Sequence, residues 1–226
     1  MPRLPGTPPS DLRDQLGSED NIEIAWVMGD GLAEMHSLTA LEPGEYDPVT
    51  GEICPEDSFS EWVIRSIHDW QAKTLNVPDA LHDADLNFIN AIIKDNRQAL
   101  SVPFQPCFVH YDYKEGNLLV ERSKDSWKLS GILDFMTSAY GDGEQDLSRM
   151  IASLAFPNQD AARTFITAYR VRCPFRSGYK ERFRIYMLID RMILWQYGRQ
   201  NKIWFPKNAV FRDFAKRFIS LDSLLD

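Results

Sequence analysis

One short strand-forming stretch interrupts a chain whose apolar pattern is otherwise typical of helices. β-Branched, aromatic and leucine residues dominate three short runs, at 107–109, 118–120 and 127–135. On both sides apolar residues recur at a spacing of three or four, which predicts helices at 18–35, 59–70, 83–100, 158–169, 177–197 and 206–221. The sequence therefore predicts an α+β, mainly α, fold with a small β-hairpin near its middle.

The segments around these predicted helices carry their own signals. The first seventeen residues hold four prolines, so we expect an extended entry segment there. Ser18 is the expected N-cap of the first helix. Gly29-Asp30-Gly31 is expected to interrupt that helix and to supply small residues where helices pack closely. Residues 42–58 are rich in proline, glycine and acid, and we expect them to form a loop.

Composition and charge exclude several classes of function. The 226 residues carry a net charge of −8, so nucleic acid is not an expected partner, because non-specific binding needs a basic surface. No apolar run approaches the roughly 18 residues of a membrane span, so no membrane is expected either. The first ten residues lack the apolar core of a secretory signal. The three cysteines have no metal-binding spacing, so we expect free thiols in a cytoplasmic protein.

The residues suited to catalysis concentrate in the strand-forming stretch. HYDYKEGNLLV occupies 110–120, and a later apolar run ends at Asp134. Phosphoryl transfer needs one carboxylate to orient the attacking hydroxyl and take its proton, which Asp112 could do. It also needs an amide oxygen and a second carboxylate to hold Mg²⁺. Asn117 and Asp134 lie on neighbouring strands of the predicted hairpin, where both oxygens could point at one metal ion.

This pattern resembles a known family. HYDYKEGNLLV looks like the catalytic loop of the aminoglycoside phosphotransferase and choline kinase group, which are small-molecule relatives of protein kinases. GILDFMTSAYGDGEQDLSRM, at 131–150, looks like the metal-binding segment that follows that loop. Residues 1–12 and the helix end at 32–36 also resemble the segment after the hinge between the two lobes. The resemblance implies the C-terminal lobe of a protein-kinase-like fold.

The resemblance also implies an activity, with a role for each site residue. The chain would move the γ-phosphoryl group of ATP or GTP to a hydroxyl of a small molecule, with Asp112 as the catalytic base. Asn117 and Asp134 would ligate Mg²⁺ and through it bind the nucleotide. Lys114 would steady the transferred group, although a solvated loop lysine explains this residue equally well. His110 would brace the loop rather than carry a proton.

The same resemblance implies how the chain is organised. Asp146 would be the buried carboxylate that ties the loop backbone in place, and Gly141 and Gly143 would be turn glycines. We expect a single kinase-like C-terminal lobe over residues 1–226. Its expected parts are a post-hinge segment, a helical region, the catalytic loop with the metal-binding hairpin, and a helical substrate-side region, at 1–17, 18–106, 107–146 and 147–226.

The sequence departs from the family in ways that leave three interpretations open. No strand-rich segment with a paired lysine precedes residue 18, so the N-terminal β lobe is expected to be missing, and Met136 replaces the glycine of D-F-G. The chain could be a phosphotransferase whose second lobe comes from another chain or was lost through a misplaced start codon. It could instead be a catalytically incomplete lobe that acts as a binding or interaction module. An unrelated metal-dependent phosphohydrolase ranks last, because a second carboxylate cluster is lacking.

Charge and uncovered surface predict the partners. Apolar residues near 1–9 and around the catalytic hairpin are expected to favour a homo-oligomer or a partner chain. Residues 163–217 hold fourteen basic and three acidic residues, a balance of +11, against −19 for the remainder. A basic surface repels polycations, so the expected small-molecule acceptor is a neutral or anionic alcohol rather than an aminoglycoside. Arginines on outer helix faces, or paired with acids, explain the same pattern.

Overall fold

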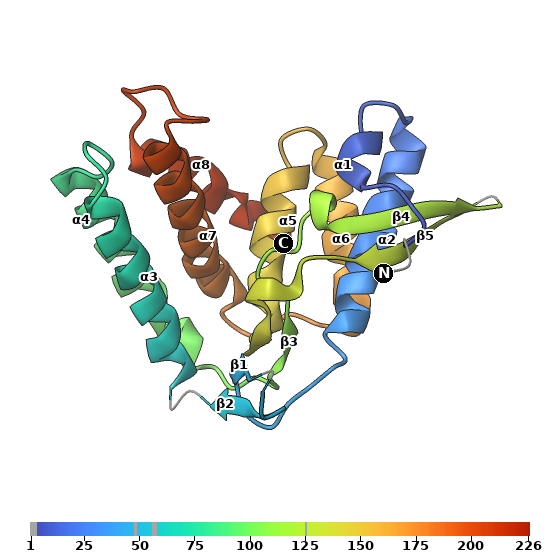
Figure 1. The fold of residues 1–226 in the computed structure, drawn as a ribbon, viewed down its shortest axis with the longest axis horizontal. Coiled ribbons are helices and arrows are strands. Elements are labelled where there is room, and N and C mark those ends of the chain that lie inside the picture. The colour runs from blue at the N-terminus through green and yellow to red at the C-terminus, as the bar shows by residue number, and fades with distance from the viewer. Residues whose placement is uncertain (1–3, 48, 56–57, 125) are drawn as a thin grey trace. The chain divides into compact units, whose positions relative to one another are not determined.

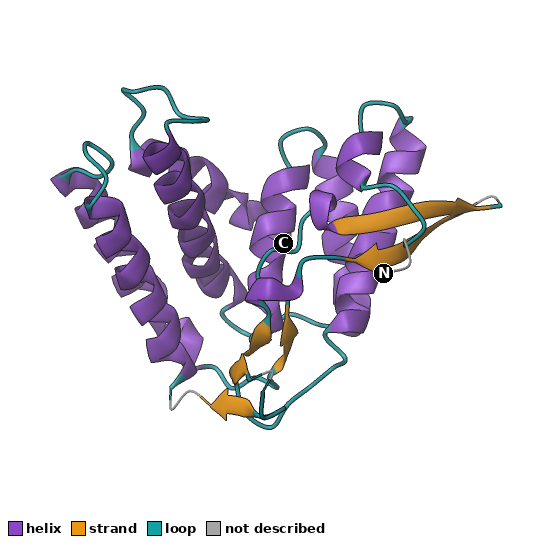
Figure 2. Cartoon of the chain, in the orientation of Figure 1, coloured by secondary structure: helices purple, strands orange, loops and turns teal. Residues whose placement is uncertain are grey.

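A computed structural model describes residues 4–47, 49–55, 58–124 and 126–226 of the chain. Contacts divide the chain into two compact units. The first comprises Met1–Pro55, Phe104–Phe175 and Leu225, and the second comprises Glu56–Pro103, Arg176–Leu224 and Asp226. The α+β, mainly α, fold is confirmed, with small sheets among the helices (Figures 1 and 2). The expected organisation as a single kinase-like lobe stays a prediction.

The first unit contains both sheets and the hairpin. Its helices are α1 (Pro9–Leu12), α2 (Ser18–Met35), α5 (Leu147–Leu154) and α6 (Gln159–Arg172). Its strands are β1 (Gly44–Tyr46), β2 (Ile53–Pro55), β3 (Cys107–Val109), β4 (Leu118–Ser123), β5 (Ser126–Ile132) and β6 (Ala139–Gly141). Short 3₁₀ helices stand at Glu115–Asn117, Phe135–Thr137 and Gly143–Asp146.

The described part of the second unit contains helices and loops but no strands. It contains α3 (Phe59–Leu75), α4 (Asp83–Asn96), α7 (Tyr179–Asn201) and α8 (Phe211–Ile219), with 3₁₀ helices at Arg97–Ser101 and Ser220–Leu225. Trp195 of α7 is fully buried and donates to the Ala80 carbonyl at 2.7 Å. Its ring stacks on Phe214 at 5.7 Å between centroids. The helices expected from the apolar pattern at 59–70, 83–100, 177–197 and after 206 are therefore present.

Helix α2 runs without a break through Gly29-Asp30-Gly31, so the expected interruption is wrong. The expected close packing is found. A Cβ on Gly29 would lie 2.3 Å from the carbonyl oxygen of Phe165 in α6. A Cβ on Gly31 would lie 2.4 Å from a side-chain methyl of Leu129. The expectation for the N-cap is also wrong, because Gly17 caps the helix in extended backbone and its successor Ser18 is already helical.

Two segments expected to be irregular or extended contain regular structure. Residues 42–58 include the β1–β2 hairpin, which joins a four-stranded antiparallel sheet of order β2-β1-β6-β3. Residues 48, 56 and 57 of this expected loop lie outside the described part. The entry segment contains the one-turn helix α1, which begins at Pro9, a residue whose fixed φ favours a helix start. Just before it, Thr7 pairs with the edge of β4 at Val120.

Replacing Gly29 with alanine should destabilise the fold. The new Cβ would meet a backbone oxygen of α6, and a backbone atom cannot move aside cheaply, so we expect a loss of about 1–3 kcal/mol in unfolding free energy. Gly17→Ala is the matched control, because nothing lies within 4 Å of its Cβ position. Urea denaturation of both variants provides the measurement. Equal stability of the two would show that α2 and α6 are not in close contact.

Candidate active site

The β4–β5 hairpin brings the two expected metal ligands to one end of the hairpin. Leu118 pairs with Ile132, and the Leu133 N–H donates to the Asn117 carbonyl at 2.8 Å. Asn117 thus lies immediately before β4, and Asp134 lies shortly after β5. Asp134 is exposed and adopts left-handed backbone with φ of 65°, a conformation that aspartate tolerates better than most residues.

Asp112 is tied to two of the other expected site residues. Its Oδ2 accepts from the Lys114 ammonium at 2.5 Å and from the Asn117 amide nitrogen at 2.9 Å. The same amide nitrogen also donates to the Asp112 carbonyl at 2.9 Å. The Asn117 side chain is therefore oriented with its nitrogen on Asp112, which leaves its oxygen as the atom able to ligate a cation.

His110 lies behind the loop and is completely buried. Its Nε2 donates to the Leu133 carbonyl at 2.8 Å, and its Nδ1 accepts from the Asp112 N–H at 3.2 Å. Its ring packs against Phe135 at 5.1 Å between centroids. Both ring nitrogens are engaged with backbone, which supports a bracing role for His110.

Asp146 lies beneath the loop as a buried carboxylate. Oδ2 accepts from the His110 N–H at 2.7 Å and lies 3.2 Å from His36 Nε2, while Oδ1 accepts from the Tyr111 N–H at 2.7 Å. Tyr111 has a φ of 62°, which is rare for a bulky residue. The two backbone contacts with Asp146 stabilise this strained turn. Asp112 is the next residue of the loop.

Arg149, Glu115 and Arg13 were not singled out from the sequence. Arg149 of α5 has its Nε 3.5 Å from Asp112 Oδ1. Glu115 is buried and accepts from Arg13 of the entry segment and from the Ser153 hydroxyl of α5. The signal for Arg149 was its position three residues after Asp146, since residues at that spacing share one face of a helix.

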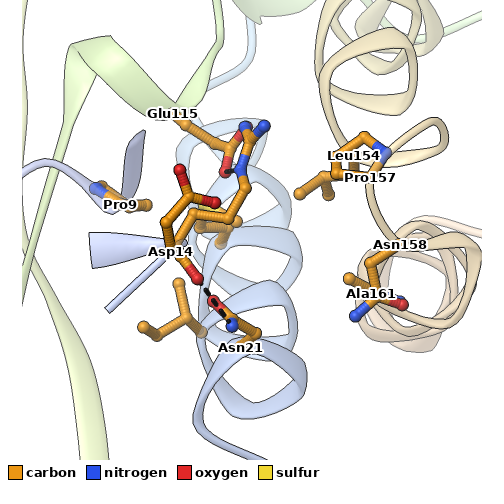
Figure 3. A pocket seen from close by; sticks show the side chains of 11 residues that line it. Pro9, Asp14, Asn21, Glu115, Leu154, Pro157, Asn158 and Ala161 are labelled. Atoms are coloured by element: carbon orange, nitrogen blue, oxygen red, sulfur yellow. Dashed lines mark hydrogen bonds and ion pairs between the residues drawn. The ribbon is translucent and has the colours of Figure 1, made fainter. Parts of the chain in front are cut away.

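A pocket of about 180 Å³ lies on the side of the loop where Glu115 points. Figure 3 shows Asp14 and Glu115 on one side and Leu154, Pro157 and Asn158 across from them. The expected site residues do not line it. The buried carboxylate of this pocket, Glu115, is already paired with Arg13 and Ser153.

The donor set suits a hard cation. The oxygens of Asn117 and Asp134 are of the type that Mg²⁺ prefers, and Mg²⁺ is commonly held by one or two protein oxygens together with substrate phosphates. In the described part of the chain, no three His, Cys, Asp or Glu side chains gather as a metal cluster. The residues therefore fit an ion completed by a nucleotide rather than a fully protein-bound ion.

Apolar side chains are exposed beside the hairpin. Met136 is 92% exposed, and Phe135 and Leu4 are about half exposed. The first three residues of the expected uncovered region lie outside the described part of the chain. The expectation of self-association or of a partner chain stays a prediction. None of the described helices combines the length and apolarity that crossing a membrane requires.

Comparison with known families identifies the chain's relatives. A sequence profile for the group described as "Phosphotransferase enzyme family" matches residues 1–182. The chain belongs to this family. The resemblance inferred from the loop and hairpin motifs is thereby confirmed. A search of curated proteins gave no significant match.

Several solved structures have a similar fold. An aminoglycoside phosphotransferase in ternary complex with AMP-PNP and hygromycin B matches with a TM-score of 0.64 and 14% identity, over 99% of this chain and 69% of that one. The gentamicin complex of APH(2″)-IIa matches with a TM-score of 0.60 and 15% identity, over 100% and 71%. A choline/ethanolamine kinase family protein from Mesorhizobium loti matches with 0.58 and 17%, over 100% and 68%. The chain spans about two thirds of the length of such structures.

Burial around Asp146 predicts a loss of stability in alkali. Burial first, and then the nearby Asp146 and Asp142 carboxylates, raise the pKa of the Cys107 thiol from 9.0 to about 12. Above pH 9 the Cys107 thiol loses its proton in the unfolded state but keeps it in the folded state. The free energy of unfolding therefore keeps its full contribution from the buried thiol below pH 9 and loses it between about pH 9 and 12. The slope is about 1.4 kcal/mol per pH unit for one proton.

The measurement is urea unfolding between pH 8.5 and 10. Averaged over this pH range, Cys107→Ala should remove about 0.6 proton from the slope, whatever it does to stability at neutral pH. Cys54→Ala is the control, because Cys54 is exposed. An unchanged slope for Cys107→Ala would contradict the burial of the thiol beside Asp146.

Proposed function

We propose that the chain carries the catalytic loop of a small-molecule kinase that moves the γ-phosphoryl group of ATP or GTP to an alcohol. The main support is the Asp112 carboxylate, which is held within hydrogen-bond distance of Lys114 and Asn117 on a loop that the buried Asp146 braces. Family membership supports phosphotransferase chemistry in general. Solved relatives were determined with AMP-PNP, ADP and GDP, which supports a nucleotide as the donor.

Each residue has a role in this proposal. Asp112 orients the acceptor hydroxyl and accepts its proton as the oxygen attacks phosphorus. Asn117 and Asp134 would hold Mg²⁺, which when bound would neutralise charge on the nucleotide phosphates. The Lys114 ammonium lies next to Oδ2 of Asp112. It can turn from this oxygen toward the negative charge that develops on the transferred phosphoryl group. His110 acts only through the loop backbone.

The charges at Asp112 favour a neutral or anionic acceptor. Lys114 contacts the Oδ2 side of this carboxylate and is 39% exposed, so an incoming polycation meets a positive side chain there. The basic segment 163–217 contributes less than its sequence suggests, because several of its side chains are paired with acids, as Arg184 is with Asp222 at 2.7 Å.

The three cysteines are free, which supports the cytoplasmic location.

Asp112→Asn should abolish turnover in the active protein that contains this chain. Removing a general base typically lowers the rate about 10²- to 10⁴-fold, and the near-isosteric amide can keep the contact with Lys114. Phosphoryl transfer from ATP and GTP with Mg²⁺ is the measurement, and circular dichroism checks folding. Asp11→Asn, at an exposed helix position, is the control. Full turnover by Asp112→Asn would contradict the assignment of Asp112 as the general base. Absence of transfer by the wild type with every acceptor would favour the interaction module.

An acceptor panel tests the substrate class. Neutral sugars, hydroxy acids and phosphorylated alcohols should be phosphorylated in preference to kanamycin-like polycations. For anionic acceptors KM should rise with salt, because screening weakens attraction to Lys114. Efficient phosphorylation of a polycation, weakening as salt rises, would show that acidic rather than basic groups receive the acceptor.

A further inference from the structure

The two oxygens of Asp112 have different surroundings. Oδ2 accepts hydrogen bonds from Lys114 and Asn117. Oδ1 is buried and has no hydrogen-bond partner, although Arg149 Nε lies 3.5 Å away. About a fifth of the Asp112 side chain is exposed, so its exposed surface does not include Oδ1. An acceptor hydroxyl can therefore reach the carboxylate only from the side of Oδ2.

A buried carboxylate oxygen without a hydrogen bond is costly unless a positive charge compensates it. The Arg149 guanidinium is the cation placed on that side, and its side chain is only 14% exposed. Attraction of one oxygen toward Arg149 fixes the orientation of the carboxylate, with its other oxygen facing outward.

The position of Arg149 follows from the helix that carries it. Asp146, Arg149 and Ser153 lie at spacings of three and four residues, so they share one face. Each contacts a successive part of the catalytic loop: Asp146 bonds the backbone of 110–111, Arg149 faces Asp112, and Ser153 donates to Glu115. The start of α5 thus positions the loop backbone and the base side chain together.

We propose that Arg149 is the positioning residue for the base: it holds Oδ1 of Asp112 inward, so that Oδ2 faces the acceptor and takes its proton. This inference rests on the proposed function and deepens it. Arg149 does not touch the acceptor in this arrangement, so its loss should lower kcat rather than raise the KM of the acceptor.

The kinetic test uses Arg149→Gln and Arg149→Lys in the active protein. Arg149→Gln should lower kcat about 10- to 100-fold, because small misplacement of a reacting group has effects of this size. KM for nucleotide and acceptor should change little, and Arg149→Lys should recover part of kcat. Arg172→Gln is the control, since Arg172 forms an exposed ion pair with Asp30 on α2 and should leave kcat unchanged. Unchanged kcat in Arg149→Gln, or a rise in acceptor KM alone, would overturn the inference.

A thermal-unfolding cycle tests the contact without any activity. Arg149→Gln should lower the melting temperature, because it leaves the buried Oδ1 uncompensated. Adding Asp112→Asn should then recover much of the loss, since no charge remains to be compensated. Additive effects of the two substitutions would overturn the contact. If Asp112→Asn leaves turnover intact, the proposed function fails. If Asp112→Asn abolishes turnover while Arg149→Gln leaves it intact, only this inference fails.

Discussion

The Asp146 carboxylate is the contact on which the site depends. It is buried and interacts with three nitrogen groups, the His110 N–H, the Tyr111 N–H and the His36 ring. A buried carboxylate is tolerated only when such donors surround it, so its position allows little variation. In return it holds Tyr111 in a backbone conformation that a tyrosine rarely adopts. The next residue is Asp112, whose carboxylate accepts hydrogen bonds from Lys114 and Asn117.

Helix α5, which follows Asp146, also contacts other parts of the loop. α5 begins directly after Asp146, and its inner face carries Arg149 and Ser153 toward the same segment. Groups on one helix keep fixed spacings, so backbone and side-chain contacts are set together. Glu115 extends the arrangement to Arg13, which joins the entry segment to the loop. The loop is therefore held from the helix side and from the chain's beginning.

Local patterns predicted the elements that local interactions form. The apolar spacing identified the long helices, and the neighbouring strand-forming runs at 118–120 and 127–135 identified the β4–β5 hairpin. Both patterns depend on near neighbours in sequence. β1 and β6 were missed, since Gly44 pairs with Tyr140 nearly a hundred residues away. The loop motif singled out Asp112 and Asn117, and their side chains form a hydrogen bond. Arg149 was harder to find, because an arginine on an amphipathic helix is usually solvated and only its distance to Asp112 distinguishes it.

The total charge of a segment differs from the charge that an acceptor meets at the site. Much of the positive charge at 163–217 is engaged within each unit: Arg172 pairs with Asp30 in the first, and Arg184 with Asp222 in the second. Arg182 is fully buried and donates to the Ala99 and Ser177 carbonyls. Such groups contribute little field at a distance, because close partners and solvent screen them. Lys114 and Arg149 act within hydrogen-bond or ion-pair distance of the base. On the proposed function, Lys114 at the catalytic loop, rather than the chain's overall charge balance, selects the charge of the acceptor.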